Sequence, residues 1–206
     1  MTERGMIFNA PMIRALLDGS KTQTRRIMKV QPESEEFESR FILDSTTRNE
    51  IGKWCWTEPG VFVNPRRSAL FSCPFGAVGD RLWVREAHSI RVEPSEYSTG
   101  AAWYRESDIG RQWEGDIRWK PSIHMPRWAS RITLEITDVR VERLNSISDE
   151  DARAEGYPGE RAVDGGSFDP WLWFRNLWDG IYPEQSFKHN PWVWVIEFRR
   201  VEGGAA

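Results

Sequence analysis

Cysteine and histidine are both scarce in this chain of 206 residues, which contains two cysteines and three histidines. Cys55 and Cys73 do not form a CxxC pair, so neither a zinc ribbon nor a redox dithiol is indicated. The histidines lie far apart in the sequence, which argues against a two-histidine nuclease and against a histidine-rich metal site. We therefore expect no metal and no cofactor.

Several longer patterns are also missing. No apolar run reaches the length of a signal peptide or a membrane span, so we expect a cytoplasmic protein without a membrane partner. The motifs GxSxG, GxGxxG and HExxH and the Walker loop do not occur, which removes several common solutions for acyl transfer, nucleotide binding and zinc-dependent hydrolysis. Nothing in the sequence indicates an oligomeric state.

The charge of the chain is unevenly distributed. With 28 basic and 31 acidic residues, the net charge of -3 excludes a uniformly basic nucleic-acid binder but permits a local basic patch. The first 29 residues hold six basic and two acidic side chains, a local charge of +4. Half of these basic residues fall within residues 19–27, GSKTQTRRI, where a glycine precedes five side-chain donors: Lys21, Thr22, Thr24, Arg25 and Arg26. The residues alone fit a solvated edge strand, an anion or nucleic-acid site, or a catalytic centre.

Local signals place this cluster between a helix and a strand. Asn9 is a suitable helix N-cap, and Gly19 is a typical helix stop. The residues that follow can alternate as a strand over 22–27. One face of this strand then carries Thr22, Thr24 and Arg26, and the other carries Gln23 and Arg25.

The rest of the chain predicts a small barrel interrupted by two long insertions, at residues 31–72 and 87–128. Residues 31–53 lack a clean period and predict a long surface loop or a mobile insertion. Strands are predicted at 81–86, from Ile132 onward with a bulge near Asp138, and at 191–201, where a near-continuous apolar run indicates a strand covered on both faces. Short helices are predicted from Ser148 to Gly156 and from Asp169 to Gly180. Short helices between antiparallel strands favour a single α+β barrel domain over 1–206 rather than a doubly wound sheet.

Twelve tryptophans are far more than a chain of this length usually holds. We expect most of them to pack in the core or under loops, because each has a large apolar body, and a minority to offer platforms on which a base can stack. Glu155 is unusual in a different way. It stands in the last turn of the short helix after Ser148, where a carboxylate opposes the helix dipole and is mildly unfavourable unless a cation faces it.

Lys21 and Thr24 are the candidate catalytic pair. A threonine hydroxyl is a poor nucleophile until a base removes its proton, and a lysine serves as that base only when burial or a nearby cation lowers its pKa. Arg25 and Arg26 are such cations. The same cluster can equally bind an anion without any chemistry.

Four motifs occur in order along the chain: Gly19-x-Lys21-Thr22-x-Thr24-x-Arg26, Val78-Gly79-Asp80-x-Leu82-x-Val84, Ile147-Ser148-x-x-x-Ala152-x-x-Glu155-Gly156 and Val193-x-Val195-Ile196-Glu197-Phe198. In this order they resemble the ASCH family, whose domains are similar to PUA domains. With RLWVRE at 81–86 and PSIHMPRWASR at 121–131, the arrangement is most similar to ASCH-domain proteins encoded by phages and prophages. The resemblance implies a PUA-like β-barrel with short flanking helices and a cleft beside the first helix.

The resemblance also implies a ligand: single-stranded RNA, a nucleoside or a modified base. One branch of the family is an amidohydrolase that removes the acetyl group from N(4)-acetylcytidine with a lysine, a threonine and a glutamate, which match Lys21, Thr24 and Glu155. Other ASCH proteins are RNA-binding or RNA-cleaving, so a non-catalytic RNA-binding module of a phage and a ribonuclease are the alternatives. Ligand contacts are expected from seven further residues: Thr22, Arg25, Arg26, Trp83, Arg85, His124 and Arg127.

Overall fold

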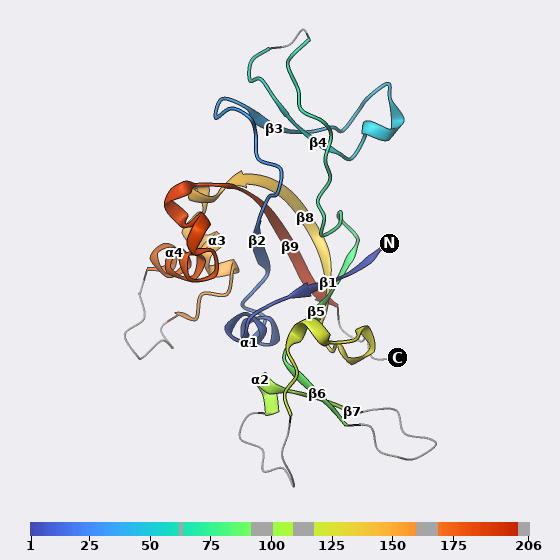
Figure 1. Ribbon diagram of the computed structural model, residues 1–206, viewed down its shortest axis with the longest axis vertical. Helices are drawn as coiled ribbons and strands as arrows, with labels where there is room; N and C mark the ends of the chain where they lie inside the picture. Colours follow the sequence, from blue (N-terminus) through green and yellow to red (C-terminus); the bar gives the residue numbers. More distant parts are fainter. Residues whose placement is uncertain (62–63, 92–100, 109–117, 160–168, 202–206) are drawn as a thin grey trace.

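A five-stranded mixed sheet forms the centre of the computed structural model, which describes residues 1–61, 64–91, 101–108, 118–159 and 169–201 (Figure 1). The strand order is β1-β5-β8-β9-β2, in which β1 and β5 are parallel and the other neighbours are antiparallel. This confirms the α+β class. The strands span Glu3–Ile7 (β1), Gln23–Ile27 (β2), Arg81–Arg85 (β5), Thr133–Arg143 (β8) and Trp192–Val201 (β9).

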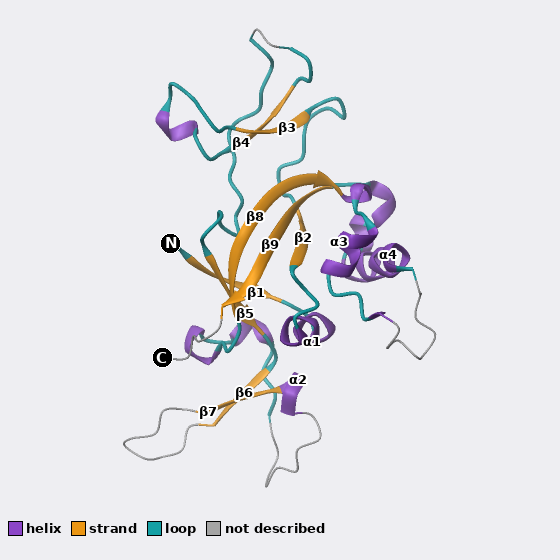
Figure 2. Ribbon diagram, turned by 180° about the vertical axis from the view of Figure 1, so that it is seen from behind, coloured by secondary structure: helices purple, strands orange, loops and turns teal. Residues whose placement is uncertain are grey.

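The sheet is strongly arched, as the long strands β8 and β9 show in Figures 1 and 2. The pairing of β8 with β9 shifts register between Ile136 and Asp138, which confirms the predicted bulge. Strands β1 and β2 stand at opposite ends of the strand order, yet Arg26 Nη2 of β2 donates to Ile7 O of β1 at 2.9 Å. The arch therefore brings the two end strands within reach of one another.

Three helices have the capping residues that the sequence predicts. Helix α1 (Ala10–Asp18) begins at Asn9, whose Oδ1 accepts from Met12 N at 3.0 Å, and ends at Gly19 with φ 82°. Helix α3 (Asp149–Ala154) begins with a capping box in which Ser148 and Asp151 bond each other's backbone N–H. Helix α4 (Pro170–Ile181) begins at an Asp169 cap and continues one residue past the predicted stop at Gly180.

Strand β9 is buried on both faces, as its apolar run predicts. Trp194, Ile196 and Phe198 face the main core, which α1, β1 and β5 complete. Val193 and Val195 face a second core under α3 and α4, which contains Phe174 and Trp178 of α4. Ile181, the last residue of α4, is 38% exposed. In both views α3 and α4 lie together beside β2.

The two insertions form small sheets at opposite ends of the molecule (Figures 1 and 2). Strands β3 (Glu38–Phe41) and β4 (Trp54–Thr57) pair in the first, and β6 (His88–Arg91) and β7 (Ala101–Tyr104) pair in the second, followed by α2 (Arg105–Asp108). The prediction of a surface loop over 31–53 is therefore wrong in part. Phe37 and Ile42, which flank β3, are buried, and a strand of four residues is too short for its alternation to stand out.

The first insertion is joined to the five-stranded sheet by aromatic packing. Trp56 lies 5.0 Å from Trp192 between ring centroids, and Trp54 lies 5.7 Å from Trp194, edge to face. Short 3-10 turns complete the fold at Arg48–Glu50, Ser122–His124, Arg127–Ala129, Leu144–Ser146, Pro183–Gln185 and Phe187–His189. Within the described ranges, no helix combines the length and the apolar character needed to cross a membrane.

Candidate functional site

Lys21 and Glu155 meet at the junction of β2 and α3. Lys21 Nζ donates to Glu155 Oε2 at 2.7 Å and to the Glu155 carbonyl oxygen at 2.8 Å. Both side chains are buried, with 0% and 2% of their surface exposed. The cation expected opposite Glu155 is therefore Lys21, and it neutralises a carboxylate placed at the unfavourable end of α3.

Backbone contacts hold this junction together. Lys21 N donates to Ala15 O of α1 at 3.0 Å, and Thr22 N donates to Ala154 O of α3 at 2.8 Å. Gly156 follows Glu155 with φ 98°, and a Cβ added to it would lie 2.8 Å from Ala15 Cβ and 3.3 Å from Lys21 Cβ. The glycine thus allows the end of α3 to pack directly against α1 and Lys21.

Arg25 is the second buried cation of the site and lies beside the first. Its Nη2 is 3.0 Å from Asp151 Oδ2 and 3.2 Å from Glu142 Oε2, and its Nη1 is 3.6 Å from Glu155 Oε1. The side chain has no exposed surface. Arg25 is therefore enclosed by carboxylates, and a ligand at the surface does not reach it.

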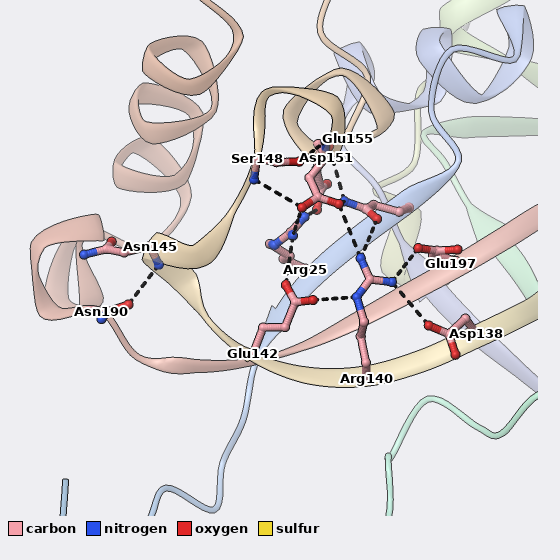
Figure 3. A network of polar contacts seen from close by, with 11 residues as sticks. Arg25, Asp138, Arg140, Glu142, Asn145, Ser148, Asp151, Glu155, Asn190 and Glu197 are labelled. Atoms are coloured by element: carbon pink, nitrogen blue, oxygen red, sulfur yellow. Dashed lines mark hydrogen bonds and ion pairs between the residues drawn. The ribbon is translucent and has the colours of Figure 1, made fainter. Parts of the chain in front are cut away.

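Arg140 continues the network toward solvent, as Figure 3 shows. It contacts Asp138 at 3.2 Å, Glu142 at 2.6 Å and Asp151 at 3.3 Å, and it also pairs with Glu197. The bulge in β8 makes this possible, since Val139 takes up the inward orientation after it and Arg140 faces α3 instead. The acids of this group outnumber the bases, with Asp138, Glu142, Asp151, Glu155 and Glu197 set against Lys21, Arg25 and Arg140.

The surroundings shift the pKa values of three side chains of the network: Lys21, Asp151 and Arg140. Burial lowers the pKa of Lys21, the Glu155 carboxylate opposes this change, and Arg26 and Arg25 lower the pKa further. Burial acts to raise the pKa of Asp151, but the hydrogen bond from Gln23 and the charge of Arg25 outweigh it, and the net pKa is below the usual range. Burial acts to lower the pKa of Arg140, yet Glu142 and Glu197 raise it overall. Lys21 is thus the member whose charged form is disfavoured.

Thr24 lies on the other face of β2. It pairs with Ile196 of β9, which faces the main core, and it is fully buried. Its hydroxyl has no hydrogen-bond partner among the described residues, so it bonds neither Lys21 nor Glu155. The predicted alternation is confirmed, but the charged residues gather on the Gln23 and Arg25 face rather than on the Thr24 face. The alternative of a solvated edge strand is wrong, because Lys21, Gln23, Thr24 and Arg25 are all buried.

Among the described residues, none of the expected ligand contacts other than Arg25 forms a hydrogen bond or ion pair with the side chain of Lys21 or of Glu155. Trp83 and Arg85 of β5 stack at 4.4 Å between the guanidinium carbon and the ring, and both are half-buried. Arg127 pairs with Glu3 at 2.9 Å. Arg26 lies over the Phe8 ring at 5.2 Å. His124 and Thr22 are exposed.

A cleft of about 710 Å³ lies on the outer side of the same junction, between α1 and the segment after α3. Tyr157 and Trp173 form an aromatic wall, with ring centroids 5.6 Å apart and planes at 74°. Ser20 and Gly156, the neighbours of Lys21 and Glu155, also line it, whereas the predicted catalytic side chains do not. Sequence reasoning did not select Tyr157 or Trp173; the aromatic directly after the Glu155-Gly156 motif was the available signal.

Comparison with known proteins assigns neither a family nor a function to this site. No family model matches the chain, and neither a curated protein nor a solved structure matches it. Within the described part of the chain, no group of three or more His, Cys, Asp or Glu side chains is arranged to hold a metal ion. The function is therefore argued from the side chains of this site.

Proposed function

We propose that this chain is an ASCH-like domain with a PUA-like barrel, and that it hydrolyses an amide on a modified nucleoside, such as the acetyl group of N(4)-acetylcytidine. The observation that carries the proposal is the buried pair of Lys21 and Glu155, 2.7 Å apart, in which burial lowers the pKa of the lysine. A buried lysine whose pKa is lowered holds its proton less tightly and is a candidate for proton transfer. The contact of Arg26 with Ile7 O supports the closed barrel.

Three side chains take part in the proposed reaction: Thr24 as the nucleophile, Lys21 as the base and acid, and Glu155 as the group that positions Lys21. Thr24 Oγ1 attacks the amide carbonyl carbon while neutral Lys21 accepts the hydroxyl proton, and Lys21 then returns this proton to the departing exocyclic amine. Water attacks the resulting threonine ester with Lys21 again as the base, which releases acetate and restores the hydroxyl. Glu155 holds the lysine by its Oε2 atom throughout. The unpartnered hydroxyl of Thr24 is free to make this bond.

The base of the substrate is proposed to enter the cleft beside α1. There Tyr157 and Trp173 offer aromatic faces for stacking, a contact that every base can make. Neither Lys21 nor Thr24 lines this cleft and both are buried, so the reaction requires the junction to open and expose both side chains to the substrate.

Release of cytidine from N(4)-acetylcytidine tests the proposal. We expect turnover by the wild type, loss of at least about 100-fold in Lys21→Met and Thr24→Val, and an intermediate loss in Glu155→Gln, because proton transfer typically contributes this factor or more. Arg199→Met is the matched control, since this exposed arginine near the C-terminal end of β9 pairs with Glu135 and forms no other ion pair with a described residue. Equal rates in the wild type and Lys21→Met rule the mechanism out.

A non-catalytic RNA-binding module is the second candidate. It is favoured by the position of Lys21, Thr24 and Glu155, none of which lines the cleft. In that case single-stranded RNA binds with an affinity that falls steeply with salt, and Arg26→Ala lowers the salt slope by about one. Intact RNA after long incubation distinguishes this module from the third alternative, a ribonuclease.

A further inference from the structure

Each carboxylate oxygen of Glu155 lies near a different cation: Oε2 is hydrogen-bonded, whereas Oε1 has a charged neighbour but no hydrogen bond among the described residues. Its Oε2 accepts from Lys21 Nζ at 2.7 Å, and its Oε1 lies 3.6 Å from Arg25 Nη1. We propose that Arg25 is a positioning residue, which shares Glu155 with Lys21 and thereby controls how strongly that carboxylate holds the lysine as an ammonium. The catalytic meaning of this role rests on the proposed function, but the role itself does not.

Arg25 is buried, and its contacts with carboxylates fix it in place. Its guanidinium is buried, with Nη2 held between Asp151 and Glu142, and its carbon lies 5.9 Å from the Phe174 ring of the second core. Contact of one guanidinium nitrogen with two carboxylates fixes the orientation of the whole group, because its donors are arranged in a rigid plane. The orientation directs Nη1 toward Glu155.

The charges that face Lys21 are few. Glu155 comes from the end of α3, Arg25 and Arg26 come from β2, and the ring of Phe8, which precedes α1, lies 5.9 Å from Nζ. Of these groups only Glu155 stabilises the ammonium by a direct ion pair. When Arg25 is removed, Glu155 is left to Lys21 alone and a nearby positive charge disappears. Both changes favour the protonated lysine.

Arg140 supplies a matched comparison within the same network. It shares Asp151 and Glu142 with Arg25, but among the described residues it forms no ion pair with Glu155. A general loss of positive charge or of network stability affects both arginine variants. A change that passes through Glu155 affects only the Arg25 variant.

The experiment is an NMR titration of the Lys21 side chain in the wild type, Arg25→Met and Arg140→Met. We expect the pKa of Lys21 to rise by about one unit or more in Arg25→Met, as is usual when a like charge is removed at close range, and to stay close to the wild-type value in Arg140→Met. An unchanged pKa in Arg25→Met overturns the proposal. An equal rise in both variants also overturns it.

If Arg25→Met does not fold, the wild-type protein decides the question. The guanidinium signals of Arg25 are expected to follow the titration of Lys21, and those of Arg140 are not; Arg25 signals that ignore this titration contradict the proposal. Hydrolase activity and the pKa of Lys21, measured in the same proteins, separate the role of Arg25 from the proposed function. If Arg25→Met raises the pKa of Lys21 but the wild type does not hydrolyse N(4)-acetylcytidine, the proposed function is wrong and the role of Arg25 stands. If the wild type is active but Arg25→Met leaves the pKa of Lys21 unchanged, the proposed function stands and the role of Arg25 is wrong.

Discussion

Lys21 Nζ lies 2.7 Å from Oε2 of Glu155, although the two residues are 134 positions apart in the chain, and neither side chain is exposed to an appreciable extent. This ion pair ties the start of β2 to the end of α3 and closes the junction against which α1 packs. Because the pair is buried, each charge depends on the other, and the site is sensitive to any change that removes only one of them.

Removal of Lys21 alone is expected to be strongly destabilising. Lys21→Met leaves Glu155 with Arg25 at 3.6 Å as its remaining cation, and breaking a buried pair in this way typically costs about 3–5 kcal/mol. The double variant Lys21→Met/Glu155→Gln removes both charges and is expected to recover part of this loss. Urea unfolding measures both values. A single variant as stable as the exposed control Arg199→Met contradicts the interpretation of a buried pair.

Asp151 is expected to contribute to the acid sensitivity of the fold. Its pKa is lower in the folded chain than the ordinary value of 3.8, so its stabilisation is complete above that value and is lost as the pH falls through the folded pKa. Asp151→Asn should therefore flatten the fall in unfolding free energy between about pH 5 and pH 1. The control is Asp149→Asn, an exposed neighbour on the same helix, which should keep the wild-type slope. Identical slopes in all three proteins are the contrary result.

Substitution of Gly156 tests the close packing of α3 on α1. Gly156→Ala places a methyl group 2.8 Å from Ala15 Cβ at φ 98°, so it combines a steric clash with backbone strain. Gly79→Ala introduces the strain alone, because no atom lies within 4 Å of the added carbon at φ 85°. We expect a loss of about 1–2 kcal/mol for Gly79→Ala and a further 1–3 kcal/mol, roughly, for Gly156→Ala. If thermal unfolding shows equal losses of stability for Gly156→Ala and Gly79→Ala, the added methyl group does not clash at the junction.

The aromatic wall of the cleft is expected to bind the base of a nucleoside. Trp173→Ala should weaken the binding of N(4)-acetylcytidine by about tenfold or more, since stacking of a base on an aromatic ring contributes about 1–3 kcal/mol. Trp128→Ala is the control, because Trp128 is 58% exposed and lies outside the lining of the cleft. Calorimetric titration compares the two variants with the wild type. An affinity that Trp173→Ala leaves unchanged places the ligand elsewhere.

Much of the local structure was predictable from the sequence because its causes are local. The caps at Asn9, Ser148 and Asp169 each accept from a backbone N–H three residues ahead, so the residues that make the bond are neighbours in the chain. The bulge near Asp138 was visible as a break in alternation. The continuous apolar run of β9 likewise indicated burial on both faces.

The sequence by itself thus determined the starts of α1, α3 and α4, four of the five strands of the main sheet and the α+β class, and it marked Glu155 as a carboxylate that is unfavourable unless a cation faces it. Only the tertiary structure decided that Lys21, Thr24 and Arg25 are buried, that the charges gather on the Arg25 face of β2, and that Tyr157 and Trp173 form a cleft. The physical reason is that burial depends on what a distant segment covers. The local sequence of β2 is typical of an exposed edge strand. Its burial comes from α3 and α4, which lie more than 100 residues later in the chain and pack across it.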